Sequence, residues 1–211
     1  MRVTVKICGL TSAIDARAAA AAGADYIGFV FDPASRRCVG AAPAWIQEIG
    51  GVVKVGVFRN HAVAAVARAR DEAGLDLVQL HGDEPPESCA ALGGRARVIK
   101  AVPVSGRVDW PAVARYAGVA RILFDTASPT GGGSGRTFAW AALAGAPAGL
   151  EFWLAGGLTP ENVAAAVAQA RPAGVDVASG VESPGGGKDG ARMRAFVAAV
   201  RAAARQVESE K

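Results

Sequence analysis

Short apolar runs alternate with alanine-rich stretches along the whole chain. Eight such runs are present, and several are nearly continuous in hydrophobicity, as is typical of strands buried on both faces of a parallel sheet. We expect a strand at each of them: Val3–Ile7, Tyr26–Phe31, Val52–Phe58, Leu75–Leu80, Ala96–Val102, Ala120–Phe124, Leu150–Ala155 and Val175–Ala178.

Helix start and stop signals occupy the segments between these runs. Ser12 precedes an alanine-rich helix that closes near Gly23, and Asn60 precedes another that ends near Gly74. Proline suits the first turn of a helix and indicates further starts. These prolines are Pro43, Pro85, Pro111 and Pro160. The last helix is expected over Asp189–Arg205, followed by a frayed tail.

Eight strand–helix units in succession predict parallel strands joined by crossovers. The length suits a single α/β domain over residues 1–211, folded as a closed (β/α)8 TIM barrel. The alternative is an open, doubly wound sheet, which would place a GxGxxG turn after the first strand. Residues 6–10 read KICGL instead, so the barrel is favoured.

The composition narrows the classes of function. Hydrophobic residues make up 51% of the chain, which supports a large core and argues against disorder. No apolar run approaches the roughly 20 residues of a membrane span, and no signal-peptide pattern precedes the first strand. We therefore expect a cytoplasmic protein without membrane partners.

Charge and cysteine content favour a small anionic ligand. The formal net charge is +4, but the basic residues are scattered, so no nucleic-acid binding is expected. The three cysteines are far apart and form neither a disulfide framework nor a CxxC metal motif. We expect no metal and no cofactor.

The residues with chemical potential follow the predicted strands, where barrel enzymes carry their active sites. Cys8 ends the first strand beside Gly9, although a free cysteine is often only a small buried hydrophobe. Asp125 ends the sixth strand and could instead be a helix cap. Its apolar setting disfavours ionisation, so this carboxyl could stay protonated and donate a proton.

Glycines follow the seventh and eighth strands, where barrel enzymes bind phosphate. They are Gly156 and Gly157 in one loop and Gly180, next to Ser179, in the other. Glycine lets backbone N–H groups approach phosphate oxygens closely. Ordinary turn glycines are the alternative, but the pairing of the two loops favours a phosphate site.

Three further polar residues lie at the same predicted end of the barrel. Arg37 could grip a substrate carboxylate with its guanidinium fork, although adjacent arginines are more often solvated. His81, with Gln79, is either a structural histidine or a group that shapes the pocket. The glycine-rich residues 131–135 suggest a mobile lid or else a loose connection.

These residues belong to strings that resemble the phosphoribosylanthranilate isomerase family. The strings are KICGLT at 6–11, GFVF at 28–31 with the loop Ser35–Val39, VGVF at 55–58, QLHGDE at 79–84, LFD at 123–125, AGGL at 155–158, and SGVES at 179–183 followed by Lys188 and Asp189. They span the chain in the family's order. The resemblance implies an aldose–ketose isomerase of tryptophan biosynthesis on a TIM barrel.

The family's reaction is an Amadori rearrangement of N-(5'-phosphoribosyl)anthranilate to 1-(2-carboxyphenylamino)-1-deoxyribulose 5-phosphate. By resemblance, Cys8 is the general base and Asp125 the general acid. Arg37 would hold the anthranilate carboxylate. The phosphate would lie against the loop residues named above, Gly156, Gly157, Ser179 and Gly180.

Three positions depart from the family's pattern. Cys38 stands where an aromatic residue is common, Ala139 where Asp often precedes Trp140, and Ala178 where a first Ser often stands. The change at Ala178 could remove a phosphate contact, and the change at Cys38 could loosen the loop that carries Arg37.

Other functions remain open on the residues alone. A ribulose-phosphate epimerase would need paired histidine ligands, and the chain has only His61 and His81. A related isomerase of the histidine pathway is a second alternative. That barrel carries an Asp at the strand-one position, so Cys8 speaks against it. A non-catalytic barrel that binds phosphorylated metabolites is the third alternative. The protein is expected to be a monomer or a homodimer.

Overall fold

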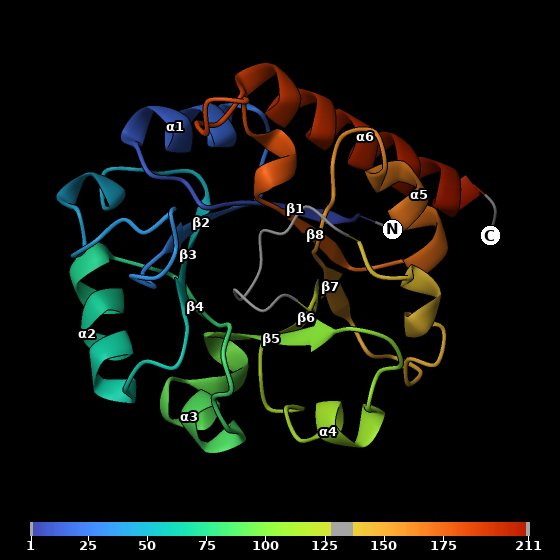
Figure 1. The fold of residues 1–211 in the computed structure, drawn as a ribbon, viewed down its shortest axis with the longest axis horizontal. Coiled ribbons are helices and arrows are strands. Elements are labelled where there is room, and N and C mark those ends of the chain that lie inside the picture. Colours follow the sequence, from blue (N-terminus) through green and yellow to red (C-terminus); the bar gives the residue numbers. More distant parts are fainter. Residues whose placement is uncertain (1, 128–136, 210–211) are drawn as a thin grey trace.

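The computed structural model describes residues 2–127 and 137–209, and in it all eight expected strands form. They are β1 (Thr4–Cys8), β2 (Tyr26–Val30), β3 (Val53–Phe58), β4 (Leu77–Leu80), β5 (Val98–Val104), β6 (Arg121–Thr126), β7 (Phe152–Leu154) and β8 (Gly174–Val177). Each strand pairs in parallel with the next, and β8 pairs with β1, so the sheet closes. The predicted (β/α)8 barrel is confirmed (Figure 1).

Helices form an outer layer around the strands (Figure 1). The α-helices are α1 (Ala13–Ala21), α2 (Val63–Ala73), α3 (Pro86–Ala91), α4 (Trp110–Ala114), α5 (Val163–Ala170) and α6 (Gly190–Ser209). Short 3-10 turns are η1 (Ala44–Ile46), η2 (Gly94–Ala96), η3 (Trp140–Leu143) and η4 (Ser179–Val181). As predicted, the Ser12 hydroxyl caps α1 by accepting from Asp15 N at 3.1 Å.

Three expected helix boundaries are wrong. Only η1 forms after Pro43, and its single turn buries Ile46. Asn60 is not a cap: α2 begins at Val63, and the Asn60 side chain accepts from Asp83 N at 2.7 Å. The last helix continues to Ser209 because its buried apolar face continues beyond the expected end.

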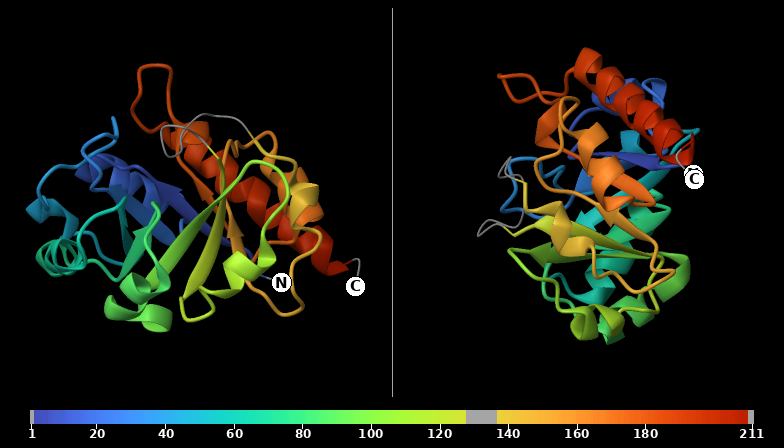
Figure 2. Two further views of the ribbon diagram at one scale, coloured as in Figure 1. Left: turned by 60° about the horizontal axis from the view of Figure 1, so that its bottom comes forward. Right: turned by 90° about the vertical axis from the view of Figure 1, so that its right-hand side faces the viewer.

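Helix α6 lies along the outside of the first strand (Figure 2). Arg201 donates to the Val3 carbonyl and forms a 2.7 Å ion pair with Asp25. The C-terminal helix therefore holds the strand at which the barrel closes. In the described part of the chain, no helix is both long enough and apolar enough to cross a bilayer.

The alternation of side chains along each strand produces two cores. The larger core lies between the sheet and the helices, and a smaller cluster fills the barrel interior. Trp153 is the largest residue of the interior cluster, and its ring packs against Tyr26 with centroids 4.7 Å apart. Bulky side chains thus fill the inside of the barrel, and open space is left at its C-terminal mouth.

A buried ion pair on the helix side of the sheet joins strand β5 to the loops after β3 and β4. Lys100 Nζ on β5 lies 2.8 Å from Glu84 Oε2, and both side chains are almost fully buried. The Glu84 carboxylate also accepts from Asn60 N at 2.7 Å and from Gly82 N at 2.9 Å. This ion pair therefore supports the segments after β3 and β4, which border the mouth.

Replacing Lys100 tests the importance of this ion pair. Lys100→Met leaves the Glu84 carboxylate buried without its counter-ion, so we expect a loss of about 3–5 kcal/mol in the free energy of unfolding. Urea denaturation followed by circular dichroism measures it. The exposed Arg107→Met is the control and should change stability by less than about 0.5 kcal/mol. A loss below about 1 kcal/mol for Lys100→Met would contradict the assignment.

Candidate active site

A cavity of ≈ 370 Å³ opens at the C-terminal ends of the strands. This size suits a small metabolite. The cavity brings together these predicted site residues: Cys8, Arg37, Gln79, His81, Asp125, Gly156, Gly157 and Ser179. Gly180 lies in the adjoining turn η4 and is not among the lining residues. Residues 131–135 lie outside the described part of the chain.

Cys8 is placed at the cavity by the end of β1. The next residue, Gly9, has φ 72°, a left-handed conformation that suits glycine, and its N–H donates to Gly28 O at 2.9 Å. Burial raises the pKa of the Cys8 thiol, and the positive charges of Lys6 and Lys188 oppose that rise. The thiol is therefore mostly protonated at neutral pH.

Asp125 lies near the end of β6 and is 8% exposed. His81 Nε2 is 3.2 Å from Asp125 Oδ2, and the amide nitrogen of Gln79 is 3.0 Å from His81 Nδ1. If the amide donates to Nδ1, the imidazole carries its proton on Nε2 and donates it to Asp125. Gln79 and His81 thus form a chain that ends at the carboxyl group.

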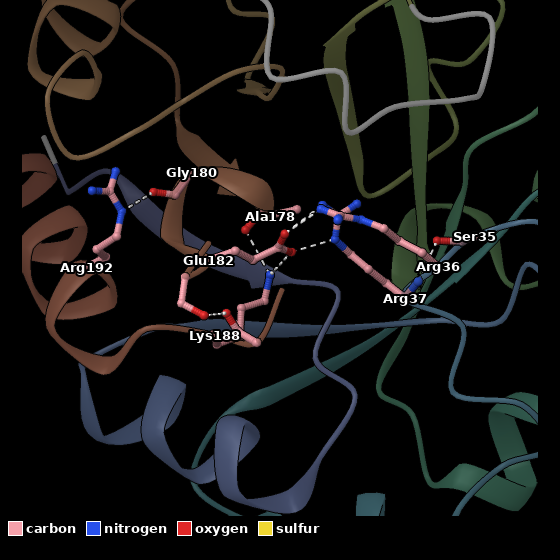
Figure 3. Close-up of polar contacts among 10 residues, drawn as sticks. Ser35, Arg36, Arg37, Ala178, Gly180, Glu182, Lys188 and Arg192 are labelled. Carbon is pink, nitrogen blue, oxygen red and sulfur yellow. Dashed lines mark hydrogen bonds and ion pairs between the residues drawn. The ribbon is translucent and has the colours of Figure 1, made fainter. Parts of the chain in front are cut away.

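Arg37 is held by an acidic residue that the sequence analysis did not assign. Its Nε lies 2.6 Å from Glu182 Oε1, and its Nη2 lies 3.1 Å from Oε2 (Figure 3). Lys188 Nζ contacts Glu182 Oε1 at 3.0 Å, and Arg36 Nη2 contacts Oε2 at 2.7 Å. Arg37 is 13% exposed and Arg36 66%, so Arg37 is the anchored member of the pair.

Glu182 is therefore a hub that links the loop after β2 to the loop after β8 (Figure 3). Burial alone would raise its pKa, but the hydrogen bond from Arg37 and the charge of Lys188 outweigh burial and lower the pKa. The carboxylate is ionised at neutral pH. The signal available in the sequence was the position of Glu182 in the string SGVES, six residues before a lysine. Its arginine partners are too distant in sequence to be found by spacing.

The two glycine-containing loops pack against each other at one side of the cavity. Gly156 and Gly157 both have positive φ, at 89° and 63°. A side chain at Gly180 would collide with the carbonyl of Leu158, so this glycine permits the close approach of the loops. Asn162 donates to Gly157 O at 2.9 Å and fixes the first loop. Backbone groups of both loops thus border the cavity beside Ser179.

Ala178, one of the departures from the family's pattern, makes a backbone contact with the loop after β8. Its carbonyl accepts from Lys188 Nζ at 2.8 Å (Figure 3). Lys188 thereby connects the end of β8 to Glu182. Asp176, two residues earlier on β8, also lines the cavity, and the sequence analysis did not assign it.

Comparison with known proteins decides the family. A family model described as N-(5'phosphoribosyl)anthranilate (PRA) isomerase matches residues 5–199. The chain belongs to the N-(5'-phosphoribosyl)anthranilate isomerase family. The resemblance drawn from the sequence is thereby confirmed.

Relatives of that name are similar over nearly their whole length. The enzyme of Pelobacter propionicus is 44% identical over 92% of this chain and 94% of its own. The enzyme of Myxococcus xanthus is 46% identical, covering 95% and 97%. The crystal structure of the Thermotoga maritima isomerase has a TM-score of 0.87 and 39% identity, covering 95% of this chain and 100% of its own.

A further isomerase structure of this family, with a TM-score of 0.84 and 36% identity over 95% of this chain and all of its own, was solved in complex with reduced 1-(o-carboxyphenylamino)-1-deoxyribulose 5-phosphate. That ligand combines a carboxylate, a sugar chain and a phosphate. The cavity of the present chain is lined by an arginine, a thiol, a carboxyl group and glycine loops.

The lowered pKa of Glu182 predicts how stability depends on pH. A carboxylate with a depressed pKa in the folded protein stabilises it above the ordinary value of about 4.3 and loses that contribution as the pH falls through the folded value. We expect Glu182→Gln to lower the free energy of unfolding at pH 7 and to flatten its fall below about pH 4.3. Urea denaturation over a pH series measures both. If the free energy of unfolding had the same pH dependence in wild type and Glu182→Gln, the assignment of Glu182 as the residue that links the two loops would be contradicted.

Proposed function

We propose that this chain isomerises N-(5'-phosphoribosyl)anthranilate to 1-(2-carboxyphenylamino)-1-deoxyribulose 5-phosphate, with Cys8 as general base and Asp125 as general acid. The supporting observation is that the two groups border one cavity with Arg37 and the glycine loops. Membership of the family supports the reaction, which belongs to tryptophan biosynthesis. In this proposal residues 1–211 act as one catalytic domain in the cytoplasm.

Ring opening is the step assigned to Asp125. Its carboxyl group would protonate the ribose ring oxygen, so that the C1–O bond breaks and a Schiff base forms at C1. His81 contacts Oδ2 at 3.2 Å and would orient the carboxyl group, and Oδ1 is the oxygen proposed to act on the substrate. The buried position of Asp125 keeps water from competing for this proton.

Proton removal from C2 is the step assigned to Cys8. The thiolate would take the C2 proton, and the electron pair left on carbon forms the enolamine, which tautomerises to the ketone. C2 is oxidised while C1 is reduced, so the redox change is internal to the substrate. The scheme therefore calls for no external oxidant, reductant or cofactor.

The two ends of the substrate would be held at opposite walls of the cavity. Glu182 occupies the Nε and Nη2 edge of Arg37, so both N–H groups of Nη1 and one of Nη2 remain for a carboxylate. The phosphate would lie against Gly156, Gly157 and Ser179, with Gly180 supporting the turn behind them. Holding both ends places C1 and C2 between the acid and the base.

Removing either catalytic group tests the proposal. We expect Cys8→Ser and Asp125→Asn each to lower kcat by roughly 10²- to 10⁴-fold, because each removes one proton transfer. Turnover of freshly prepared phosphoribosylanthranilate is followed by the fluorescence of the anthranilate ring. Cys89→Ser, at a cysteine that does not line the cavity, is the matched control and should keep near-normal kcat. Circular dichroism verifies folding. Near-normal turnover in either test variant would remove its assigned role.

The two adjacent arginines provide a test of carboxylate binding. We expect Arg37→Leu to raise KM by roughly 10- to 100-fold, because a charge-assisted pair that binds substrate is lost, whereas Arg36→Leu at the exposed neighbour changes KM by less than about threefold. Steady-state kinetics of the two variants decide between them. Equal effects at both positions would indicate a general influence of charge rather than a specific contact.

A further inference from the structure

A lysine–aspartate pair is buried inside the barrel beneath the cavity. Lys6 is fully buried, and its Nζ donates to Asp176 Oδ2 at 2.8 Å. The two residues are register partners on β1 and β8. A buried ion pair carries a desolvation penalty that an exposed pair avoids. The proposed chemistry so far gives this pair no role.

The pair lies directly beside the proposed base. Lys6 and Cys8 are two residues apart on β1, so both side chains point into the barrel. They meet over Gly28 of β2: a Cβ atom at Gly28 would lie 2.7 Å from Cys8 Sγ and 3.1 Å from Lys6 Nζ. The absence of a side chain at Gly28 thus provides the space that the sulfur and the ammonium group share.

The charges around the sulfur come from several elements. Lys6 on β1 and Lys188 before α6 favour the thiolate, whereas Asp176 on β8 disfavours it. Asp125 also lines the cavity, and the Arg37 side chain lies against Gly9, next to Cys8. Burial lowers the pKa of Lys6, but the charges of Asp176 and Cys8 outweigh burial, so the pKa is raised and Lys6 remains a cation. Of these charges, that of Lys6 opposes the rise in the pKa of Cys8 most strongly.

We propose that Lys6, held in place by Asp176, is a positioning residue that stabilises the thiolate form of Cys8. This inference rests on the proposed function, in which that thiolate is the base. The Asp176 Oδ1 atom is buried and accepts no hydrogen bond within the described structure, so the carboxylate is directed at Lys6 through its other oxygen alone. Asp176 keeps the lysine charged, and the lysine acts on the sulfur.

The test measures the ionisation of Cys8 without relying on turnover. The protein is alkylated with iodoacetamide from pH 7 to pH 11, and mass spectrometry follows the Cys8 peptide. In Lys6→Met/Asp176→Asn, which leaves no unpaired buried charge, we expect the midpoint of the rate profile to rise by about one pH unit, or roughly tenfold slower alkylation at pH 8. Lys6→Arg keeps the charge and should retain the wild-type midpoint.

Two controls separate charge from structure. Cys38 in the same samples should keep its alkylation rate. The variant Lys100→Met/Glu84→Gln removes another deeply buried ion pair, located on the helix side of the sheet, and should leave the Cys8 midpoint unchanged. An unchanged midpoint in the Lys6 double variant would overturn the inference. So would a shift of equal size in Lys6→Arg or in the Lys100 variant.

Turnover then distinguishes failure of this inference from failure of the proposed function. If Cys8 is the base, the pH profile of kcat in the Lys6 double variant should shift with the alkylation profile, and activity should recover at high pH. A shifted alkylation midpoint with an unshifted kcat profile would support the role of Lys6 and remove Cys8 from the reaction. An unshifted alkylation midpoint, together with turnover that still requires Cys8, would remove the role of Lys6 and support Cys8 as the base.

Discussion

Closure of the sheet is the constraint on which the rest of the structure depends. When eight parallel strands close, every second side chain points into one narrow space, and that space must be filled or paired. Around Trp153 it is filled by bulky apolar groups, and at the C-terminal end it is an open cavity. The buried ion pair of Lys6 and Asp176 lies between the interior cluster and the cavity. The bottom of the cavity is therefore charged rather than apolar.

The sequence was informative wherever a property is local. Strand positions followed from continuous apolar runs, and the placement of Cys8 and Asp125 at strand ends followed from the strands themselves. Local patterns failed where tertiary packing decided the outcome. Helix α6 extends to Ser209 because of its buried face, and after Pro43 a 3-10 turn that buries Ile46 forms in place of the expected helix. Neither fact is visible in caps or propensities alone.

Residues whose roles depend on distant partners could not be found by spacing. Glu182 meets Arg37 across 145 positions, and Lys6 meets Asp176 across 170. Each pair exists only because closure of the barrel brings β8 and its following loop beside the first two strands and their loops. A charged residue in the middle of a buried strand was nevertheless a usable signal. Both Lys6 and Asp176 stand at such positions, and alternation from Cys8 places Lys6 on the same face.

The buried charge of Lys6 also bears on how the proposed acid and base act on neighbouring atoms of an anionic substrate. A phosphate and a carboxylate that enter the cavity add negative charge, which disfavours a thiolate at Cys8. This effect opposes the proposed base. In the proposed function Arg37 does not offset this effect, because Glu182 and the substrate carboxylate are both paired with it. Lys6 is fully buried beside the sulfur, so in the same proposal its charge continues to act on Cys8 when substrate is bound.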